Sequence, residues 1–392
     1  MSKSVNKCLS RWPFRYTDLP FILKHCRKND WIAQLDLRSF FLQLPMAADF
    51  QKYLSLRCPL TGKLLKYARV PFGLATAPAW ASAVSSEVRR LMRARGLDTV
   101  FCYVDDFFFI CPTKAACAEA LRIALEVLAD LGFPVSAEKV VQPAQVSEIL
   151  GVVLNTVDGT LGVKEEHADW CLRLINEVLE KGHLKKRLFH SLCGTLNWVC
   201  ALIRGSRPYL RTMWDALAAR RNSSARVHLS EAARTDLLWW RARLLQLNEG
   251  GCTTKWLDTS SMDLAFTATD ASGVIGCGLW LEDELYAHLW DDEQREWSVP
   301  RQELFPVAVA FERFGESLHG KMVVIITDSI TNVFAINAGS SSSPECNKLL
   351  KRMSIAERHW GFESVAVWMP REFNAIPDAL SKFTIPGAPL CL

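Results

Sequence analysis

Two adjacent aspartates, Asp105 and Asp106, lie in the stretch VFCYVDDFFFICP, which is otherwise almost entirely apolar and aromatic. Aspartate is common in turns, so the pair could simply form the tip of a hairpin. However, the pair lacks the glycine that tight hairpins prefer, and the flanking strands have the composition of buried strands. Two carboxylates about 4 Å apart repel each other by roughly 4 kcal/mol at an effective dielectric constant of about 20. A divalent cation between them would relieve this repulsion, and hard oxygen ligands select Mg²⁺.

A third carboxylate could join this pair, and a separate set of four acidic residues follows later in the chain. Asp36 ends another apolar strand and could converge on the Asp105–Asp106 pair. Four later acidic residues each lie at the end of a predicted strand or on a predicted helix, in the order strand, helix, strand, helix: Asp270, Glu303, Asp328 and Asp378. Each of these alone is an ordinary cap or strand-end residue. Two Mg²⁺ ions at the first group, with Mn²⁺ as an alternative, would suit phosphoryl-transfer chemistry.

The segments around the first three aspartates have clear secondary-structure patterns. Residues 30–46 contain a strand that ends near Asp36, and residues 100–112 read as strand, two-residue turn and strand. Helices are predicted over 75–96, with Pro78 near the start, and over 113–134, capped by Thr113. A hairpin is predicted over 147–163 with a tight Asp158-Gly159 turn.

The second half of the chain changes character near residue 255. Residues 164–248 are predicted to be mostly helical and are rich in Lys and Arg. The stretch 248–262 has the composition of a linker. After it come three strands and then alternating helices and strands, which imply a mixed α/β sheet.

Composition limits the class of protein. The chain has 392 residues, 49% of them hydrophobic, and a formal charge of only +4, so nucleic-acid binding must be argued from local clusters. None of the 13 cysteines forms a C-x-x-C pair, which favours reduced thiols. The N-terminus has no signal-peptide pattern, and no apolar run is long enough to span a membrane. We therefore expect a soluble intracellular protein, in the cytoplasm or the nucleus, without membrane contact.

Five motifs in the first half, in this order, resemble the palm of reverse transcriptases: LDLRSFFLQLPM, VPFGLATAPAWA, YVDDFFF, LGFPVSAEKV and EILGVVLN. The resemblance implies that Asp36, Asp105 and Asp106 bind the catalytic metal ions. It also places Phe41 as a steric gate against ribonucleotides, although a core phenylalanine fits the periodicity equally well. Residues 71–73, including Phe72 and Gly73, would lie near the incoming nucleotide, and Lys139 would lie near the pyrophosphate.

The C-terminal part resembles a ribonuclease H domain through TDASGVIGCG, QELFPVAVA, TDSITNVFAIN and NAIPDALSK. That resemblance assigns Asp270, Glu303, Asp328 and Asp378 to two metal ions that direct water at an RNA phosphate. The stretches SLCGTLNWVCALIRGSRPYLRTMWDAL and WMPREFNAIPDALSK are most similar to those of DIRS-type, tyrosine-recombinase retrotransposons.

The resemblance implies an α+β fold class: a right-hand polymerase palm and thumb with truncated fingers, followed by a mixed α/β ribonuclease H-like domain. The expected domains are residues 1–163 (palm, fingers mostly missing), 164–250 (helical thumb or connection), 251–262 (linker) and 263–392 (ribonuclease H-like). The expected partners are an RNA template, a DNA primer, the RNA–DNA hybrid and dNTPs; the oligomeric state stays open.

Basic residues near the first site and in the helical segment could contact phosphates as a set, although each alone fits a solvated surface charge better. They are Arg89, Arg90, Arg93, Arg95, Lys181, Lys185, Lys186, Arg187, Arg204, Arg207 and Arg211.

One departure from the family pattern leaves the function open. Only 35 residues precede Asp36, so the basic finger subdomain that holds the triphosphate is expected to be mostly absent. The chain could be part of a larger element protein or a host-retained copy. An RNA-directed DNA polymerase coupled to ribonuclease H is the preferred interpretation. The alternatives are ribonuclease H activity alone and a catalytically idle nucleic-acid-binding module.

Overall fold

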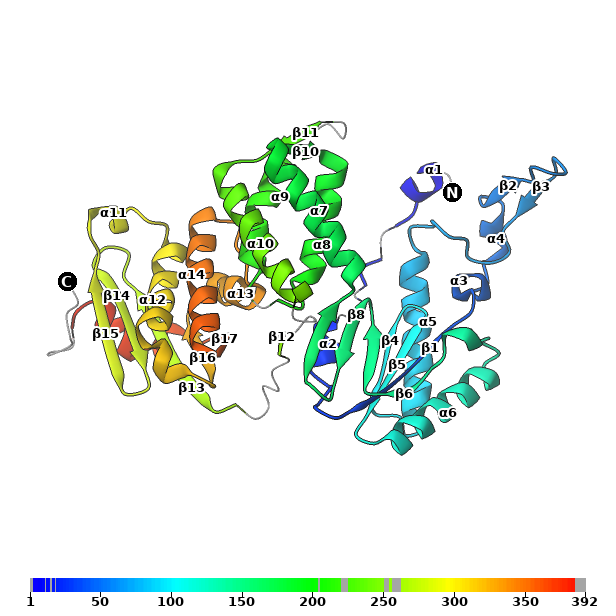
Figure 1. Ribbon diagram of the computed structural model, residues 1–392, viewed down its shortest axis with the longest axis horizontal. Helices are drawn as coiled ribbons and strands as arrows, with labels where there is room; N and C mark the ends of the chain where they lie inside the picture. The colour runs from blue at the N-terminus through cyan, green and yellow to red at the C-terminus, as the bar shows by residue number, and fades with distance from the viewer. Residues whose placement is uncertain are drawn as a thin grey trace. The chain divides into compact units, whose positions relative to one another are not determined.

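The structure is a computed structural model that describes residues 3–10, 12–14, 16–17, 19–203, 205–219, 225–249, 254–255 and 262–384 (Figure 1). The chain divides into two compact units, Met1–Gly162 and Val163–Leu392. The predicted helical segment therefore belongs to the same unit as the C-terminal sheet. Most of the predicted linker 251–262 lies outside the described residues.

The first unit is built on a four-stranded antiparallel sheet with the order β4-β5-β1-β6. Its elements are α1 (Lys3–Lys7), α2 (Leu19–Leu23), β1 (Trp31–Asp36), α3 (Phe40–Gln43), α4 (Ala48–Gln51), β2 (Ser55–Arg57), β3 (Leu64–Lys66), α5 (Ala77–Ala94), β4 (Val100–Tyr103), β5 (Asp106–Cys111), α6 (Lys114–Asp130), β6 (Val141–Ala144), β7 (Val146–Ile149), β8 (Val152–Asn155) and β9 (Thr160–Val163).

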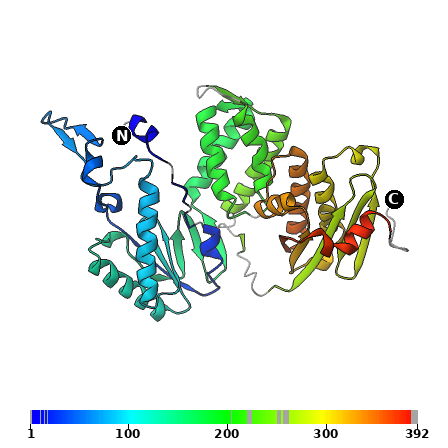
Figure 2. The ribbon, with the colours of Figure 1, turned by 180° about the vertical axis from the view of Figure 1, so that it is seen from behind.

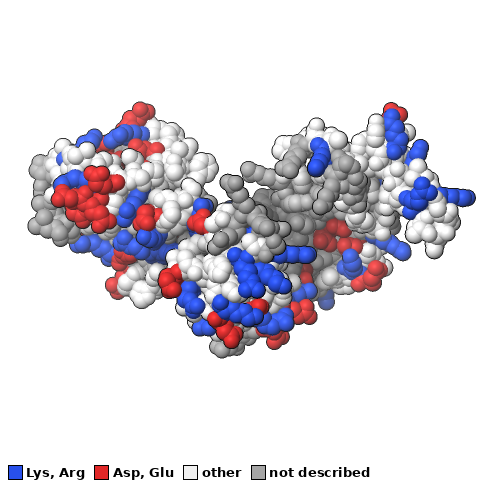
Figure 3. Space-filling model, turned by 90° about the horizontal axis from the view of Figure 1, so that it is seen from above, with Lys and Arg blue, Asp and Glu red and all other residues white. Residues whose placement is uncertain are grey.

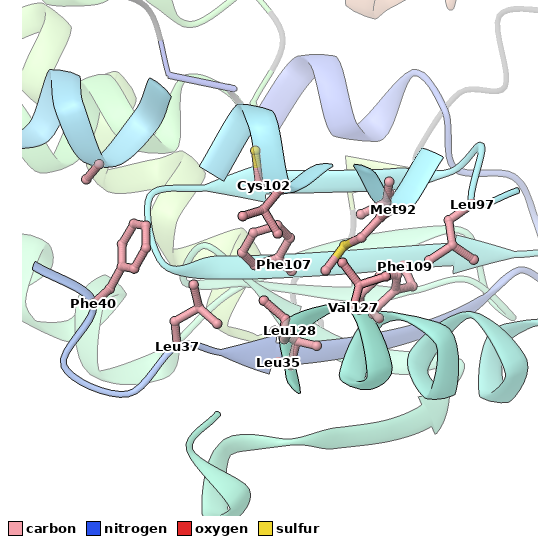
Figure 4. Close-up of a cluster of buried hydrophobic side chains, with 14 of the residues drawn as sticks. Leu35, Leu37, Phe40, Met92, Leu97, Cys102, Phe107, Phe109, Val127 and Leu128 are labelled. Atoms are coloured by element: carbon pink, nitrogen blue, oxygen red, sulfur yellow. The ribbon is translucent and has the colours of Figure 1, made fainter. Parts of the chain in front are cut away.

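Helices α5 and α6 pack on this sheet and form the core that holds its strands in place. Figure 4 shows Phe107 and Phe109 of β5 beside Met92 of α5 and Val127 of α6, and all four side chains are buried. Burial of each such side chain contributes about 1.5–3 kcal/mol to folding. The two predicted helices are confirmed, and Thr113 caps α6 by accepting a hydrogen bond from the Ala116 N–H.

The predicted hairpin over 147–163 contains one turn more than expected. Strands β7 and β8 pair across Leu150 and Gly151, which both have positive φ angles, 50° and 83°. A second connection, which includes Asp158 and Gly159, joins β8 to β9, its neighbour in the sheet. The first turn was missed because only one of its two left-handed positions is a glycine, and leucine seldom adopts this conformation.

Strands β2 and β3 form a separate two-stranded sheet whose six residues are all exposed. Apolar side chains are among the exposed ones: Leu60, in the connection between the strands, is 93% exposed, and Leu64 of β3 is 63% exposed. An isolated hairpin of this kind has little stability of its own in water.

The second unit begins with a helical part and continues into a five-stranded sheet. Its elements are α7 (Glu165–Lys181), β10 (His183–Lys185), α8 (Lys186–Val199), α9 (Arg211–Ala218), β11 (Arg226–His228), α10 (Glu231–Glu249), β12 (Thr254–Lys255), β13 (Leu264–Ala271), β14 (Gly276–Leu281), β15 (Glu284–Leu289), α11 (Asp292–Arg295), α12 (Val299–Phe314), β16 (Met322–Thr327), α13 (Ile330–Ala338), α14 (Pro344–Trp360), β17 (Glu363–Trp368) and α15 (Ala375–Ser381). Among the described residues, the helical part departs from the prediction only by the short β10–β11 pair.

A buried ion pair joins the helical part to α14. Lys351 Nζ lies 2.5 Å from an oxygen of Asp236, whose side chain is 3% exposed, and the Thr212 hydroxyl donates a hydrogen bond to the other oxygen. Burial is the largest influence on Asp236 and raises its pKa, while Lys351 and Thr212 oppose that shift. Such a pair specifies how α10 and α14 are placed more than it adds stability.

The C-terminal sheet has the order β15-β14-β13-β16-β17, with antiparallel pairs among the first three strands and parallel pairs at β13–β16–β17. Figures 1 and 2 show α12 and α14 on one face and α15 on the other, against β13 and β14. The predicted mixed α/β sheet is therefore confirmed.

Among the described residues, no helix is both long and apolar enough to cross a bilayer. All cysteines in the same part of the chain are free thiols.

Candidate functional site

The end of the first sheet gathers the three aspartates predicted to act together. Asp36 is the last residue of β1 and Asp106 the first of β5, and the two are direct partners in the antiparallel register. Because Tyr103 also pairs with Asp106, the two-residue turn consists of Val104 and Asp105. Val104 adopts a left-handed φ of 56°, an unfavourable conformation for a β-branched residue. The turn therefore brings Asp105 next to the paired residues Asp36 and Asp106.

Negative charge is concentrated at this end of the sheet. Burial raises the pKa of Asp105, and the charge of Asp36 adds to the shift. Burial also raises the pKa of Asp106 to about 6, with further contributions from the charges of Asp105 and Asp36. Lys139 counters this charge with an ammonium group 3.0 Å from Asp36 Oδ2, and the Ser136 hydroxyl donates to Asp36 Oδ1 at 2.9 Å. The cluster is therefore short of positive charge, and its one direct cationic contact among the described residues is Lys139.

The residues predicted to bind the nucleotide also come together. Phe41, on α3 just after β1, has its ring 5.5 Å from that of Phe72, centroid to centroid. Phe72 is 66% exposed, and Gly73 after it has a φ of 85°. The side chain of Asn6 fixes this loop, because it donates to the Gly73 carbonyl and accepts from the Ala75 N–H, both at 2.9 Å. Sequence reasoning did not single out Asn6.

The second unit brings its four predicted acids into one cluster. Asp270 lies on β13, Glu303 in the second turn of α12, Asp328 directly after β16 and Asp378 on α15. Burial is the largest cause of the raised pKa values of Asp270 and Glu303, and the charge of Asp328 raises both further. Such mutual influence requires that these carboxylates lie near one another.

Hydroxyl and basic groups hold these carboxylates. The Ser381 hydroxyl donates to Asp270 Oδ2 at 2.8 Å. Asp378 is bound from two sides, by Arg371 Nη2 at 2.9 Å and by Lys382 Nζ at 2.6 Å. The hydrogen bond from Lys382 is the largest cause that lowers the pKa of Asp378, and the bond from Arg371 acts in the same direction.

No group of three or more His, Cys, Asp or Glu side chains in the described part of the chain is already arranged to hold a metal ion. In each cluster a basic side chain is bound to one of the carboxylates. The donor set itself fits Mg²⁺ or Mn²⁺, since it consists of carboxylate oxygens with little competing nitrogen or sulfur. Asp36, Asp105 and Asp106 could hold ions at the first cluster, and the four acids of the second unit could do so at the second.

Four side chains that contact these acids were not singled out from the sequence: Ser136, Ser381, Arg371 and Lys382. Both serines lie inside motifs that were recognised, LGFPVSAEKV and NAIPDALSK. Their role was not visible because serine hydroxyls bond mostly to backbone and water, so residue type alone does not indicate a carboxylate partner.

Some of the basic residues that were predicted to contact phosphates form ion pairs with acidic side chains of this chain. Arg90 pairs with Glu87, Arg95 with Asp130, and Arg211 with a carboxylate one helical turn away. Arg204 lies outside the described residues. Among the residues coloured in Figure 3, basic and acidic side chains are interspersed on the visible face.

Residues 2–154 match the family described as "Reverse transcriptase (RNA-dependent DNA polymerase)". The Gag-Pro-Pol polyprotein of bovine leukemia virus (isolate Australian) is 25% identical over 228 residues, which are 57% of this chain and 15% of the polyprotein. The Pol polyprotein of feline endogenous virus ECE1 is 31% identical over 114 residues, which are 28% of this chain and 11% of that protein. The chain thus spans a small fraction of these relatives.

Two solved structures of the foamy viral protease-reverse transcriptase resemble nearly the whole chain. The dRH form in complex with double-stranded DNA has a TM-score of 0.55 at 14% identity and covers 94% of this chain and 62% of the other. The complex with an RNA/DNA hybrid has the same TM-score and identity. It covers 94% of this chain and 48% of the other chain. At this identity the likeness concerns the fold, and it confirms the predicted fold class.

Proposed function

We propose that this chain, whose residues 2–154 form a reverse transcriptase domain of the retroviral or retroelement type, is an RNA-directed DNA polymerase coupled to a ribonuclease H. The observation that carries the proposal is the register pair Asp36–Asp106, with Asp105 in the adjoining turn. Three carboxylates therefore lie at one end of the sheet, within the residues that match the family.

At the first cluster, Asp36, Asp105 and Asp106 would hold two Mg²⁺ ions. When bound, the ions would supply Lewis-acid activation of the primer 3′-hydroxyl and charge neutralisation at the leaving pyrophosphate. Lys139, which contacts Asp36, would bind the pyrophosphate or give it a proton. The ring of Phe41 would exclude the 2′-hydroxyl of a ribonucleotide, with Phe72 and Gly73 beside it.

At the second cluster, Asp270, Glu303, Asp328 and Asp378 would hold a second pair of ions and direct water at a phosphate of the RNA strand. A polymerase that copies RNA leaves an RNA–DNA hybrid, and a hybrid-specific nuclease on the same chain removes the template. The substrates would be an RNA template, a DNA primer, dNTPs and the hybrid. The C-terminal motif WMPREFNAIPDALSK supports a finer assignment to a DIRS-type retrotransposon. The site of action would be the cytoplasm or the nucleus.

The test is primer extension on an RNA template and cleavage of a labelled RNA–DNA hybrid, each with Mg²⁺ and with EDTA. We expect both activities in the wild-type chain with Mg²⁺ and neither with EDTA. Asp328→Asn should lower hybrid cleavage by at least about 100-fold and leave extension unchanged, because it removes one ligand charge from the second cluster only. Full cleavage by Asp328→Asn would disprove this site assignment.

Phe41→Ala should change nucleotide selection. Without the ring, a ribonucleotide should be incorporated about 10- to 100-fold more efficiently relative to its deoxynucleotide, since a steric barrier of about 1–3 kcal/mol is removed. Phe50→Ala, at a partly buried phenylalanine of α4, is the matched control for loss of packing. Equal selectivity in wild type and Phe41→Ala would assign Phe41 to the core instead.

Hybrid cleavage alone is the second candidate function. One observation favours it: the β2–β3 hairpin of the first unit is exposed on all six residues. Hybrid cleavage without any dNTP incorporation in the assay above would select this function.

A further inference from the structure

Arg371 is a basic residue that binds one acid of the second cluster and is influenced by the charge of others. Its Nη2 and Nε atoms lie 2.9 and 3.2 Å from Asp378 Oδ1. The pKa of Arg371 is raised, first by this hydrogen bond and then by the charges of Asp270, Asp378 and Asp328. The charge of Arg371 in turn opposes the raised pKa values of Asp270 and Glu303. The guanidinium therefore acts on all four carboxylates.

Lys382 provides a contrast within the same site. It also binds Asp378, through the other oxygen at 2.6 Å, and is exposed to a similar degree, 41% against 60% for Arg371. However, Lys382 is not among the largest causes of the pKa shifts of Asp270 and Glu303, whereas Arg371 is. Two cations thus share one carboxylate, and of the two the charge of Arg371 has the larger influence on Asp270 and Glu303.

The backbone beside Arg371 is fixed while its side chain extends into solvent. Arg371 begins the short 3-10 helix Arg371–Phe373, and its carbonyl accepts from the Asn374 N–H at 2.9 Å. The buried Asn374 donates through Nδ2 to the Thr269 carbonyl, next to Asp270. A planar guanidinium held at such a point can exchange a carboxylate for a phosphate without backbone movement, because its fork matches both groups.

We propose that Arg371 is a phosphate-binding residue of the second cluster: it neutralises the acids in the metal-free chain and binds a backbone phosphate of the hybrid once divalent ions occupy them. This role rests on the proposed ribonuclease H function. It assigns opposite effects to one side chain, since Arg371 competes with the metal ion for Asp378 and attracts the substrate. A structural residue would not show both effects.

The test uses the full chain as wild type, Arg371→Gln, Arg371→Lys and Lys382→Gln. Calorimetric titration with Mg²⁺ alone measures metal binding, and the first cluster contributes equally to every variant. Steady-state cleavage of a labelled hybrid at saturating Mg²⁺ gives kcat and KM. We expect both glutamine variants to bind Mg²⁺ about threefold more tightly, because each removes a cation from Asp378.

Only Arg371→Gln should raise KM for the hybrid, by about tenfold, since it alone loses a charge-assisted bond to phosphate. Arg371→Lys should fall between wild type and Arg371→Gln, because it keeps the charge and loses the fork. The proposal is overturned if Arg371→Gln and Lys382→Gln have the same KM while wild type cleaves the hybrid. A wild-type chain that binds Mg²⁺ and cleaves no hybrid would overturn the proposed function, and the phosphate role with it.

Discussion

Asp106→Asn is expected to abolish primer extension and, at the same time, to stabilise the metal-free protein. Activity should fall on the order of 1,000-fold, because a neutral amide replaces a charged ligand to the metal ions. Stability in EDTA should rise by on the order of 1 kcal/mol, because burial and the charges of Asp105 and Asp36 disfavour the Asp106 carboxylate. Primer extension with Mg²⁺ and urea unfolding in EDTA measure the two effects.

A fall in activity together with a rise in stability distinguishes a metal ligand from a structural residue, whose loss would lower both. Asp98→Asn is the matched control, because Asp98 is exposed and lies just before β4, whereas the Val104–Asp105 turn follows this strand. That variant should change neither quantity. Loss of extension together with a lower free energy of unfolding in Asp106→Asn would mean that the side chain supports the fold.

Gly278→Ala is expected to remove hybrid cleavage and to leave primer extension intact. A Cβ atom at Gly278 would lie 2.4 Å from the Pro377 carbonyl oxygen, 2.5 Å from Leu380 Cβ and 2.7 Å from the Ser381 nitrogen. All three atoms belong to α15, so this helix must move away from β14. Overpacking of this kind costs about 1–3 kcal/mol.

Displacement of α15 should disturb the second cluster, because the pairing of β14 with β13 sets Gly278 opposite Asp270. Gly278 pairs with Asp270 between β14 and β13, and α15 carries both Asp378 and Ser381, which donates to Asp270. Movement of α15 therefore separates Asp378 from Asp270, and cleavage should fall by at least about 100-fold. Hybrid cleavage and primer extension on the same preparation measure the effect.

Gly194→Ala, on α8, is the control for a glycine substitution in the same unit. A Cβ there meets nothing within 4 Å, so the variant should keep cleavage and gain up to about 1 kcal/mol of helix stability. Cleavage at the wild-type rate by Gly278→Ala would contradict the view that contact between α15 and the sheet positions Asp378.

The gathering of the acids could be predicted from local patterns. Asp36 and Asp106 each stand at one end of an apolar strand, and antiparallel pairing brings such ends together. The same reasoning predicted that Asp328 follows a buried strand of the C-terminal sheet. The resemblance to known motifs supplied the roles, which the pattern alone did not.

Other features depend on contacts that no local pattern encodes. Asp236 and Lys351 are 115 residues apart, and their ion pair lies between α10 and α14, which belong to the same unit. The turn at Leu150-Gly151 was missed because leucine has no preference for left-handed backbone. The position of Arg371 was missed because an exposed arginine gives no sign of its partner.

Crystals of the full chain soaked in Mn²⁺, with anomalous diffraction recorded at the manganese edge, test the central claim most directly. The account predicts anomalous peaks in coordination contact with Asp36, Asp105 and Asp106, and separate peaks among Asp270, Glu303, Asp328 and Asp378. It also predicts that Lys139 and Arg371 leave the carboxylates they now contact. Manganese bound elsewhere, with both ion pairs intact and both acidic clusters without a peak, would contradict it.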